Sequence, residues 1–308
     1  MAPRKPVAGA LAARLPDGRL HLQHGPIDLI IKAEGEAAGA AYRAAETCFA
    51  DVLATLAGEL PLLRAPAGAD PAAVRGPVAR RMVAAVYPYR AGFITPMAAV
   101  AGSVADHVLA AMLAAGSLET AFVNNGGDIA LHVAPGASLR IGLVSSLARG
   151  VAEGEVTITH GMGVGGIATS GWPGRSFSRG IADAVTVLAR DAATADAAAT
   201  VIANAVDAEH PAIRRVPASS LDPDSDLGER LVTTGVGALP DAVVAAALDA
   251  GCIVADRLRQ EGMILAALLS CQDRFRPSTH TSAAQRIEGD SGDTSPDLSR
   301  LFPGAIKR

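Results

Sequence analysis

The middle of the chain reads Thr120-Ala121-Phe122-Val123-Asn124-Asn125-Gly126-Gly127-Asp128-Ile129-Ala130-Leu131-His132-Val133. Two short apolar runs meet at a Gly-Gly pair that an amide and a carboxylate flank. Glycine reaches positive φ without strain, so this composition predicts a tight turn between two paired strands. The same residues also suit a ligand site, because glycines let a ligand approach the backbone while Asn125 and Asp128 offer polar groups. The stretch alone leaves both interpretations open.

Further strand and helix patterns extend outward from this turn. Short apolar runs bounded by Gly, Pro or Ser predict strands at 20–22, 27–33, 120–123, 129–133, 139–144, 155–159, 166–170 and 184–189. Apolar residues at helical spacing predict helices at about 36–63, 78–86, 97–115, 194–206 and 239–258. Residues 276–308 are rich in Pro, Gly, Ser and Asp, which predicts a flexible tail.

Composition and charge indicate the kind of core and exclude some classes of binding partner. Of the 308 residues, 50% are hydrophobic and only 3% are aromatic, which predicts a large core of small side chains with helices laid closely on a sheet. The formal net charge is -4, and there is no long run of Lys and Arg. A nucleic acid or an anionic membrane is therefore not an expected partner, since either requires a basic patch.

The cysteines and the apolar runs favour a cytoplasmic location. Cys48, Cys252 and Cys271 are odd in number and far apart, which fits neither a disulfide framework nor a zinc site. The apolar run at 7–13 is short for a secretory signal, and we expect no membrane-spanning segment.

Asp196 and Thr200 form a candidate metal site. They are four residues apart in an Ala-rich helical segment, so a carboxylate and a hydroxyl project from one face. Such oxygen donors suit Mg²⁺, which fills its other positions with waters, carbonyls or phosphate oxygens. The structural alternative is that Asp196 favours the helix dipole while Thr200 bonds back to a carbonyl.

The segment 161–172 has the glycine density of a phosphate-cradling loop. It lacks the lysine of a Walker loop and the helix of a dinucleotide site, so a glycine-rich bulge at a sheet edge is an equal alternative. Arg175 could fork onto a phosphate or lie on the surface. Asp183 precedes an apolar strand and is a candidate acid, base or ligand, or an Asp that bonds the local backbone.

The order of these motifs resembles the ApbE superfamily, whose characterised members are FAD:protein FMN transferases. The resemblance covers about residues 92–206 and rests on five runs taken together. They are Val104-Ala105-Asp106, Phe122 to Ile129, Ile167-Ala168-Thr169-Ser170-Gly171, Val185-Thr186-Val187, and Ala195-Asp196-Ala197-Ala198-Ala199-Thr200. An uncharacterised ApbE-like branch, with a Gly-Arg-Ser-Phe-Ser run, is most similar.

The resemblance implies a fold, a cofactor and a metal. It implies an α/β (α+β) fold with a mixed sheet flanked by helices, which we expect as a single large domain over 1–275. FAD would lie beside two stretches, and Mg²⁺ would polarise its pyrophosphate. The implied flavin residues are Asn125, Gly126, Gly127, Asp128, Ala168, Thr169, Ser170 and Gly171, with Asp196 and Thr200 as the metal ligands.

Two departures bear on the family's reaction. Transferases carry a lysine where this chain has Ala101, and a histidine with a following loop where it has Gly180. Lost cationic or proton-transfer groups typically cost orders of magnitude in rate. Two hypotheses follow: a diverged FMN transferase-like enzyme, and a noncatalytic accessory or maturation factor that binds flavin or a protein. A protein substrate or partner and a homodimer are expected in either case.

Overall fold

The computed structural model describes residues 9–144 and 152–279, whose contacts divide the chain into two compact units. The first unit contains the chain up to Ala137, together with Gly165–Ala168 and Arg190–Ala197. The second contains Ser138–Val164, Thr169–Ala189 and the chain from Ala198 onward. The expected α/β class with helices flanking a sheet is confirmed, but the strand pairs are antiparallel where we expected a mixed sheet.

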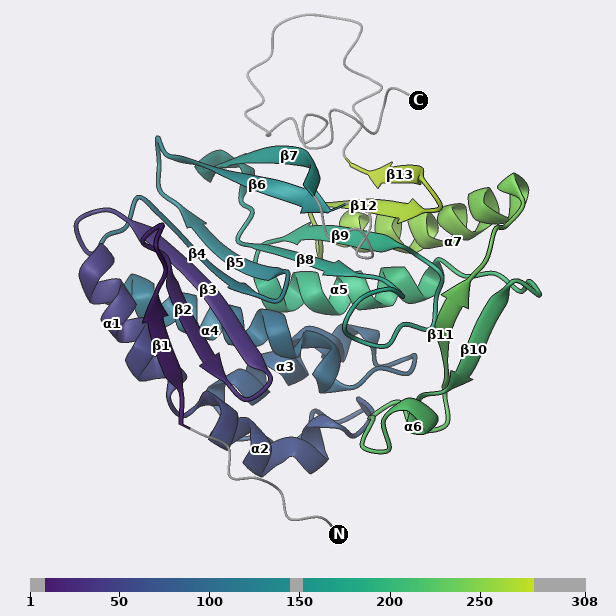
Figure 1. Ribbon diagram of the computed structural model, residues 1–308, viewed down its shortest axis with the longest axis horizontal. Helices are drawn as coiled ribbons and strands as arrows, with labels where there is room; N and C mark the ends of the chain where they lie inside the picture. The colour runs from purple at the N-terminus through teal and green to yellow at the C-terminus, as the bar shows by residue number, and fades with distance from the viewer. Residues whose placement is uncertain (1–8, 145–151, 280–308) are drawn as a thin grey trace, which may run out of the picture. The chain divides into compact units, whose positions relative to one another are not determined.

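An antiparallel sheet forms the centre of the first unit (Figure 1). Burial alternates along its third strand, where Ile27, Leu29, Ile31 and Ala33 are buried, so one face of the sheet is turned to the core. The strands, each paired with the next, are β1 (Leu11–Arg14), β2 (Leu20–His24), β3 (Ile27–Glu34), β4 (Thr120–Asn125), β5 (Asp128–Val133) and the start of β8 (Gly166–Ser170).

The predicted turn between β4 and β5 is confirmed. Asn125 pairs with Asp128, and the two glycines between them have φ values of 67° and 117°. Both values lie in the region that glycine reaches without strain, and the N–H of Gly127 donates to Oδ1 of Asn124 at 2.8 Å. Gly126 and Gly127 are exposed, so their backbone is accessible from solvent.

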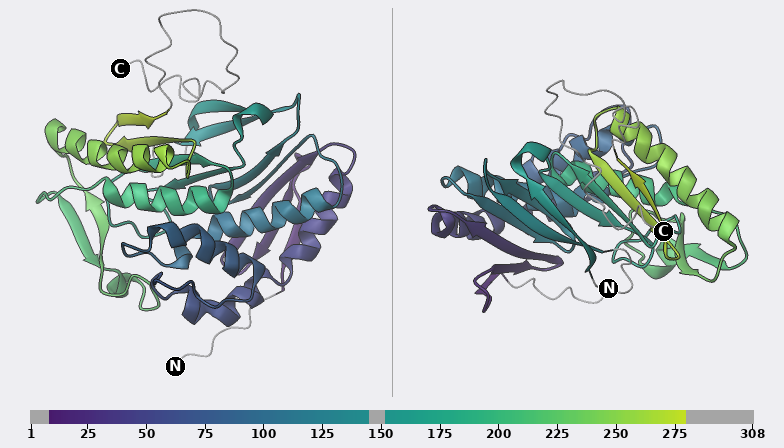
Figure 2. Two further views of the ribbon diagram at one scale, coloured as in Figure 1. Left: turned by 180° about the vertical axis from the view of Figure 1, so that it is seen from behind. Right: turned by 90° about the horizontal axis from the view of Figure 1, so that it is seen from above.

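Helices of the first unit form a layer on the core side of this sheet, where some pack on the strands and others on those helices. They are α1 (Ala38–Phe49), α2 (Val52–Leu63), α3 (Pro77–Val86) and α4 (Val100–Ala114), with 3-10 turns η1 (Tyr87–Tyr89) and η2 (Pro96–Ala99). Helix α4 packs against β4 and β5, and α1 packs against β2 and β3 (Figure 2). The prediction of one helix over 36–63 is wrong, because a turn at Ala50-Asp51 divides this region into two helices. Phe49 and Val52 are both buried, so the apolar spacing continued across the break and gave no signal of it.

We expected no membrane-spanning segment, but one helix among the described residues is long and apolar enough to be a candidate. Pro96–Ala114 is 19 residues long with a mean hydropathy of 1.6, enough to cross a membrane by length and composition. Half of this window is buried, and Val104, Val108 and Met112 belong to the hydrophobic core. The core helix of a folded domain passes the same test, and α4 occupies that position in the first unit.

The second unit contains a three-stranded antiparallel group and two hairpin sheets. Strand β9 (Ala184–Ala189) pairs with β12 (Ala266–Cys271), which pairs with β13 (Arg274–Ser278), and α7 (Asp241–Gln260) packs against β12 and β13 (Figure 2). The remaining elements are β6 (Ser138–Val144) with β7 (Ala152–Thr159), β10 (Ile213–Pro217) with β11 (Leu231–Val236), η3 (His160–Met162) and α6 (Ala218–Leu221). Helix α5 (Ala192–Ala205) gives residues to both units.

Five of the strands in the described part of the chain were not predicted. Strands β1, β10 and β13 contain arginines, and β10 and β13 also contain proline, so their composition does not look strand-like. Strand β13 extends to Ser278, inside the stretch where we expected a tail, whereas residues 280–308 lie outside the described residues.

Candidate functional site

A carboxylate of α4 fixes the start of α5, the helix that carries both predicted metal ligands. The side chain of Asp106 accepts hydrogen bonds from the N–H groups of Ala192 (3.0 Å) and Ala193 (2.9 Å). Such bonds satisfy free N–H groups at a helix N-terminus, where the helix dipole favours a carboxylate. Burial raises the pKa of Asp106 to about 6, although the two N–H donors and Arg81 act to lower it. The sequence alone gave Asp106 no role, because its partners are more than eighty residues away.

Asp106 predicts a pH dependence of folding. Its pKa is raised from 3.8 to about 6 in the fold, so its stabilising contribution is complete below the unfolded value and is lost as pH rises through about 6. Relative to Asp106→Asn, the wild type should lose up to about 3 kcal/mol of unfolding free energy across this window. Urea unfolding of both proteins at a series of pH values measures the difference. A difference that does not change with pH would contradict the assignment.

The first unit brings three of the predicted residues together at the start of α4. Oδ2 of Asp196 accepts a hydrogen bond from the N–H of Gly102 at 3.0 Å, and Nδ2 of Asn125 donates to the carbonyl oxygen of Ala101 at 3.1 Å. Burial, and then the charge of neighbouring Asp128, hold the pKa of Asp196 well above its usual range, against the N–H groups of Gly102 and Ala101. Asp196 thus combines a partly buried carboxylate with a second negative charge nearby.

Close backbone contacts explain several glycines around this group. A Cβ on Gly102 would lie 2.2 Å from the carbonyl oxygen of Ala192, so glycine lets α4 approach the start of α5. A Cβ on Gly165 would lie 2.2 Å from the carbonyl oxygen of Arg190, and one on Gly166 would lie 2.1 Å from the backbone of Asp191. Neither interpretation of the glycine-rich segment foresaw this, because glycine density alone does not distinguish a ligand cradle from backbone packing.

The other predicted binding residues have varied surroundings. Thr200 is partly buried, one turn after Asp196 on α5, while Ala168 is buried in β8. Oγ1 of Thr169 lies 2.9 Å from Oγ1 of Thr186, so this hydroxyl has a partner within the second unit. Ser170 and Gly171 follow it, and Arg175 is exposed.

Asp183 organises three segments of the second unit. Its Oδ1 accepts from Nε1 of Trp172 at 3.3 Å and its Oδ2 accepts from the N–H of Gln272 at 2.6 Å. The side chain of Gln272 continues the network, because its Nε2 donates to the carbonyl of Gly237 at 2.7 Å. Gln272 was not predicted, and its place in the tight turn between β12 and β13 could not be recognised without those strands.

Removing one of these hydrogen bonds should destabilise the protein. In Asp183→Asn, one carboxylate oxygen becomes an amide that cannot accept a hydrogen bond, so either Trp172 or Gln272 loses its partner. We expect a loss of about 1–3 kcal/mol in unfolding free energy. Trp172 is the only tryptophan, so its emission should shift as well. Unchanged stability and emission would contradict a structural role for Asp183.

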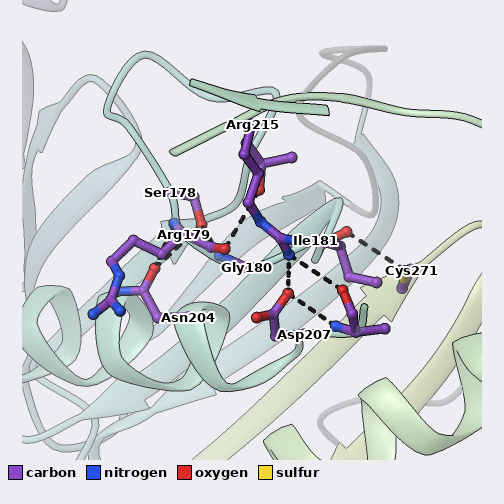
Figure 3. A network of polar contacts seen from close by, with 10 residues as sticks. Ser178, Arg179, Gly180, Ile181, Asn204, Asp207, Arg215 and Cys271 are labelled. Atoms are coloured by element: carbon purple, nitrogen blue, oxygen red, sulfur yellow. Dashed lines mark hydrogen bonds and ion pairs between the residues drawn. The ribbon is translucent and has the colours of Figure 1, made fainter. Parts of the chain in front are cut away.

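Gly180, where the resemblance places a histidine, is packed against the end of α5. A Cβ at this position would lie 2.0 Å from the carbonyl oxygen of Ala203 and 2.7 Å from that of Val206. The flanking backbone is held as well, since Oδ1 of Asn204 accepts from the N–H of Arg179 at 2.9 Å (Figure 3). The segment therefore has no room for a side chain at 180.

A family model now places the chain. The model described as AbpE bacteria matches residues 12–279. The chain belongs to this family. The match confirms the resemblance to the ApbE superfamily that the order of motifs indicated. The matched residues of this AbpE bacteria chain include residues of both compact units.

Relatives of this AbpE bacteria chain include UPF0280 proteins of archaea. One from Methanothrix thermoacetophila is 42% identical over 130 residues, which are 42% of this chain and 52% of that protein. One from Methanopyrus kandleri is 36% identical over 174 residues, which are 54% of this chain and 68% of that protein. The chain therefore aligns with about half of the first relative and about two thirds of the second.

Solved ApbE structures are similar to this chain at low identity. The ApbE protein from Thermotoga maritima is 13% identical with a TM-score of 0.47, over 92% of this chain and 100% of that one. The flavin transferase ApbE from Vibrio cholerae is 15% identical with a TM-score of 0.46, over 90% and 98%. At these TM-scores, membership of the AbpE bacteria family rests on the family model and the UPF0280 relatives.

Proposed function

We propose that the protein binds FAD, or a related flavin nucleotide, together with Mg²⁺ held by Asp196 and Thr200. The observation that carries this proposal is the position of Asp196, whose partly buried carboxylate lies near that of Asp128. Two carboxylates repel each other in such surroundings, and a bound cation would offset that repulsion.

The donor set fits a hard cation. Among the described residues, no three His, Cys, Asp or Glu side chains are grouped as a metal site. The proposed site at Asp196 and Thr200 therefore offers few protein ligands. Mg²⁺ suits a site of this kind, because it commonly takes one or two carboxylates and completes its shell with waters and phosphate oxygens. The hydroxyl of Thr200, one turn along α5, would add a neutral oxygen. When bound, the cation would supply positive charge to a pyrophosphate.

In this proposal the remaining predicted residues recognise the flavin nucleotide. Asn125–Asp128 offer an exposed two-glycine turn with polar side chains at both ends, and Ala168–Gly171 and Arg175 are further candidate contacts. Asp183 is the candidate acid or base, with its carboxylate oriented by the hydrogen bonds from Trp172 and Gln272. The reaction proposed is a diverged form of FMN transfer, in which a Ser or Thr hydroxyl of a protein would bond to the FMN phosphorus of FAD, the pyrophosphate bond would break to release AMP, and a base would take the hydroxyl proton.

A noncatalytic flavin- or protein-binding accessory factor is the second candidate. It is favoured by Ala101 in place of the family's lysine, and by the packing of Gly180, which leaves no space for the family's histidine. The two candidates differ in whether FMN becomes attached to a protein. Mass spectrometry of proteins incubated with the purified chain, FAD and Mg²⁺ distinguishes them, because only transfer adds the mass of FMN to a Ser or Thr.

Flavin binding itself is tested by titrating FAD into the full chain in the presence of Mg²⁺. We expect saturable binding of one FAD per chain. Quenching of Trp172, the only tryptophan, and a change in flavin emission report it. Equilibrium dialysis that finds no bound FAD would overturn the proposal, whatever the fluorescence shows.

A further inference from the structure

Arg179 lies in a short segment whose backbone is fixed on both sides. Its N–H donates to Oδ1 of Asn204 at 2.9 Å, and its carbonyl oxygen accepts from Oγ1 of Thr233 at 3.4 Å. The N–H of Thr233 also donates to the carbonyl of Ser178 at 2.8 Å, and Gly180 is packed against α5. Hydrogen bonds to α5 and β11 therefore fix the backbone position from which the Arg179 side chain extends.

The guanidinium of Arg179 is available for a ligand. Its side chain is exposed and forms no hydrogen bond or ion pair with any of the described residues. Its neighbour Arg215 differs, because that guanidinium is paired with Asp207 and bonds the carbonyl of Ala208. Figure 3 shows the side chain of Arg179 extending beside α5 and away from Asp207. Its charge acts on Asp207 only from a distance, where it helps to lower the pKa of that carboxyl against the effect of burial. The second unit thus presents a guanidinium on a fixed backbone that donates no hydrogen bond to the described residues.

The backbone of Arg179 is anchored on the face of α5 that also carries Thr200, one of the two proposed metal ligands. Thr200 and Asn204 lie four residues apart on that helix and so share one face. Arg179 is anchored at Asn204, and an extended arginine side chain is longer than one helical turn of roughly 5.4 Å. An arginine side chain extended along α5 from Asn204 would reach the level of Thr200.

We propose that Arg179 binds the phosphate groups of the nucleotide, an assignment that rests on the proposed function. A pyrophosphate carries more negative charge than one divalent cation on α5 offsets, so its binding requires a further positive group, and position 101 is alanine. A guanidinium suits this role because its fork of N–H donors matches two phosphate oxygens and its charge is not lost at physiological pH. Asn204 acts as the positioning residue, through its hydrogen bond to the backbone of Arg179.

Arg179→Gln tests the assignment with a matched control. Arg257→Gln makes the same change at an exposed position of α7 in the same unit. We measure dissociation constants of FAD, riboflavin and inorganic pyrophosphate by calorimetry in Mg²⁺, for the full-length wild type and both variants. Arg179→Gln should weaken FAD and pyrophosphate by about tenfold or more and leave riboflavin, which has no phosphate, within about twofold. Arg257→Gln should leave all three unchanged.

The three probes separate this inference from the proposed function. If the wild type binds FAD and Arg179→Gln binds it equally well, the inference is wrong and the proposed function stands. If pyrophosphate binding depends on Arg179 while FAD does not bind at all, the inference stands and the proposed function fails. If the wild type binds neither FAD nor pyrophosphate, both fail. Equal losses for FAD and riboflavin would also overturn the phosphate assignment, because they would indicate a general disturbance of the site.

Discussion

Gly180→Ala is expected to destabilise the protein by about 3 kcal/mol or more, the upper range of the cost of forcing extra atoms into a packed site. The added Cβ would lie 2.0 Å from the carbonyl oxygen of Ala203, which is backbone and cannot rotate away. Relief of the clash would require the segment to leave α5 and the hydrogen bond between Arg179 and Asn204 to break. Urea unfolding or thermal unfolding of the purified variant measures the loss.

Gly161→Ala is the matched control for this substitution. It lies in the same unit, and a Cβ there would meet no atom within 4 Å. Its stability should stay within about 0.5 kcal/mol of the wild type. A Gly180→Ala protein as stable as Gly161→Ala would show that the close approach of Gly180 to α5 is wrong.

The same contact decides what a restored histidine would do. Gly180→His reintroduces the residue that the ApbE resemblance places there, but it should lower stability at least as much as alanine and should not create transferase activity. The segment that the resemblance aligns with the family's histidine-bearing loop passes directly into β9, and its Gly180 is packed on α5. A folded Gly180→His protein that attaches FMN to a protein faster than the wild type would contradict this.

Asp196→Asn is expected to stabilise the free protein while it removes the effect of Mg²⁺ on flavin binding. The ionised carboxylate is costly in the free fold, because burial and Asp128 both raise its pKa. Asparagine keeps an oxygen to accept the N–H of Gly102 and removes the charge, so we expect a gain of about 1–2 kcal/mol at neutral pH. A neutral amide is a much poorer ligand for Mg²⁺, so the proposed cation should be lost.

Asp70→Asn is the control for that substitution, since it removes the same charge from an exposed loop of the first unit. It should change neither stability nor flavin binding. Thermal unfolding in EDTA measures the stability of the three proteins. Loss of stability in Asp196→Asn, in the absence of metal, would show that the carboxylate is a structural anchor and not a group held ready for a cation.

The fold could be predicted where local chemistry determines it. The turn at Gly126-Gly127 followed from two apolar runs and a glycine pair, because positive φ values are a local requirement. Strand β9 was visible for a similar reason, since an apolar run from Ala184 to Ala189 is buried throughout. The break at Ala50-Asp51 lies within a continuous apolar pattern, and the arginines and prolines of β10 and β13 hide their strand pairing. Strand β12 is an apolar run like β9, so its own residues could have predicted it.

The candidate site divides in the same way. Asp196 and Thr200 were proposed as metal ligands from helical spacing, and Asn125 and Asp128 as ligand contacts from the composition of a turn. The roles of Asp106, Gln272 and Asn204 could not be predicted, because the side chain of each bonds a backbone group of a segment distant in sequence. Gly180 was noticed only as a departure from a family pattern, and its packing against Ala203 and Val206 now gives that departure a physical reason.

In the proposed function, Asp196 couples a divalent cation to flavin nucleotide binding. The dissociation constant of FAD, measured by calorimetry for the wild type and Asp196→Asn in Mg²⁺ and again in EDTA, tests it directly. We predict that Mg²⁺ tightens FAD binding to the wild type by about tenfold or more and has no effect on the variant. Equal affinities of the wild type in Mg²⁺ and in EDTA, or the same Mg²⁺ effect in both proteins, would contradict the account.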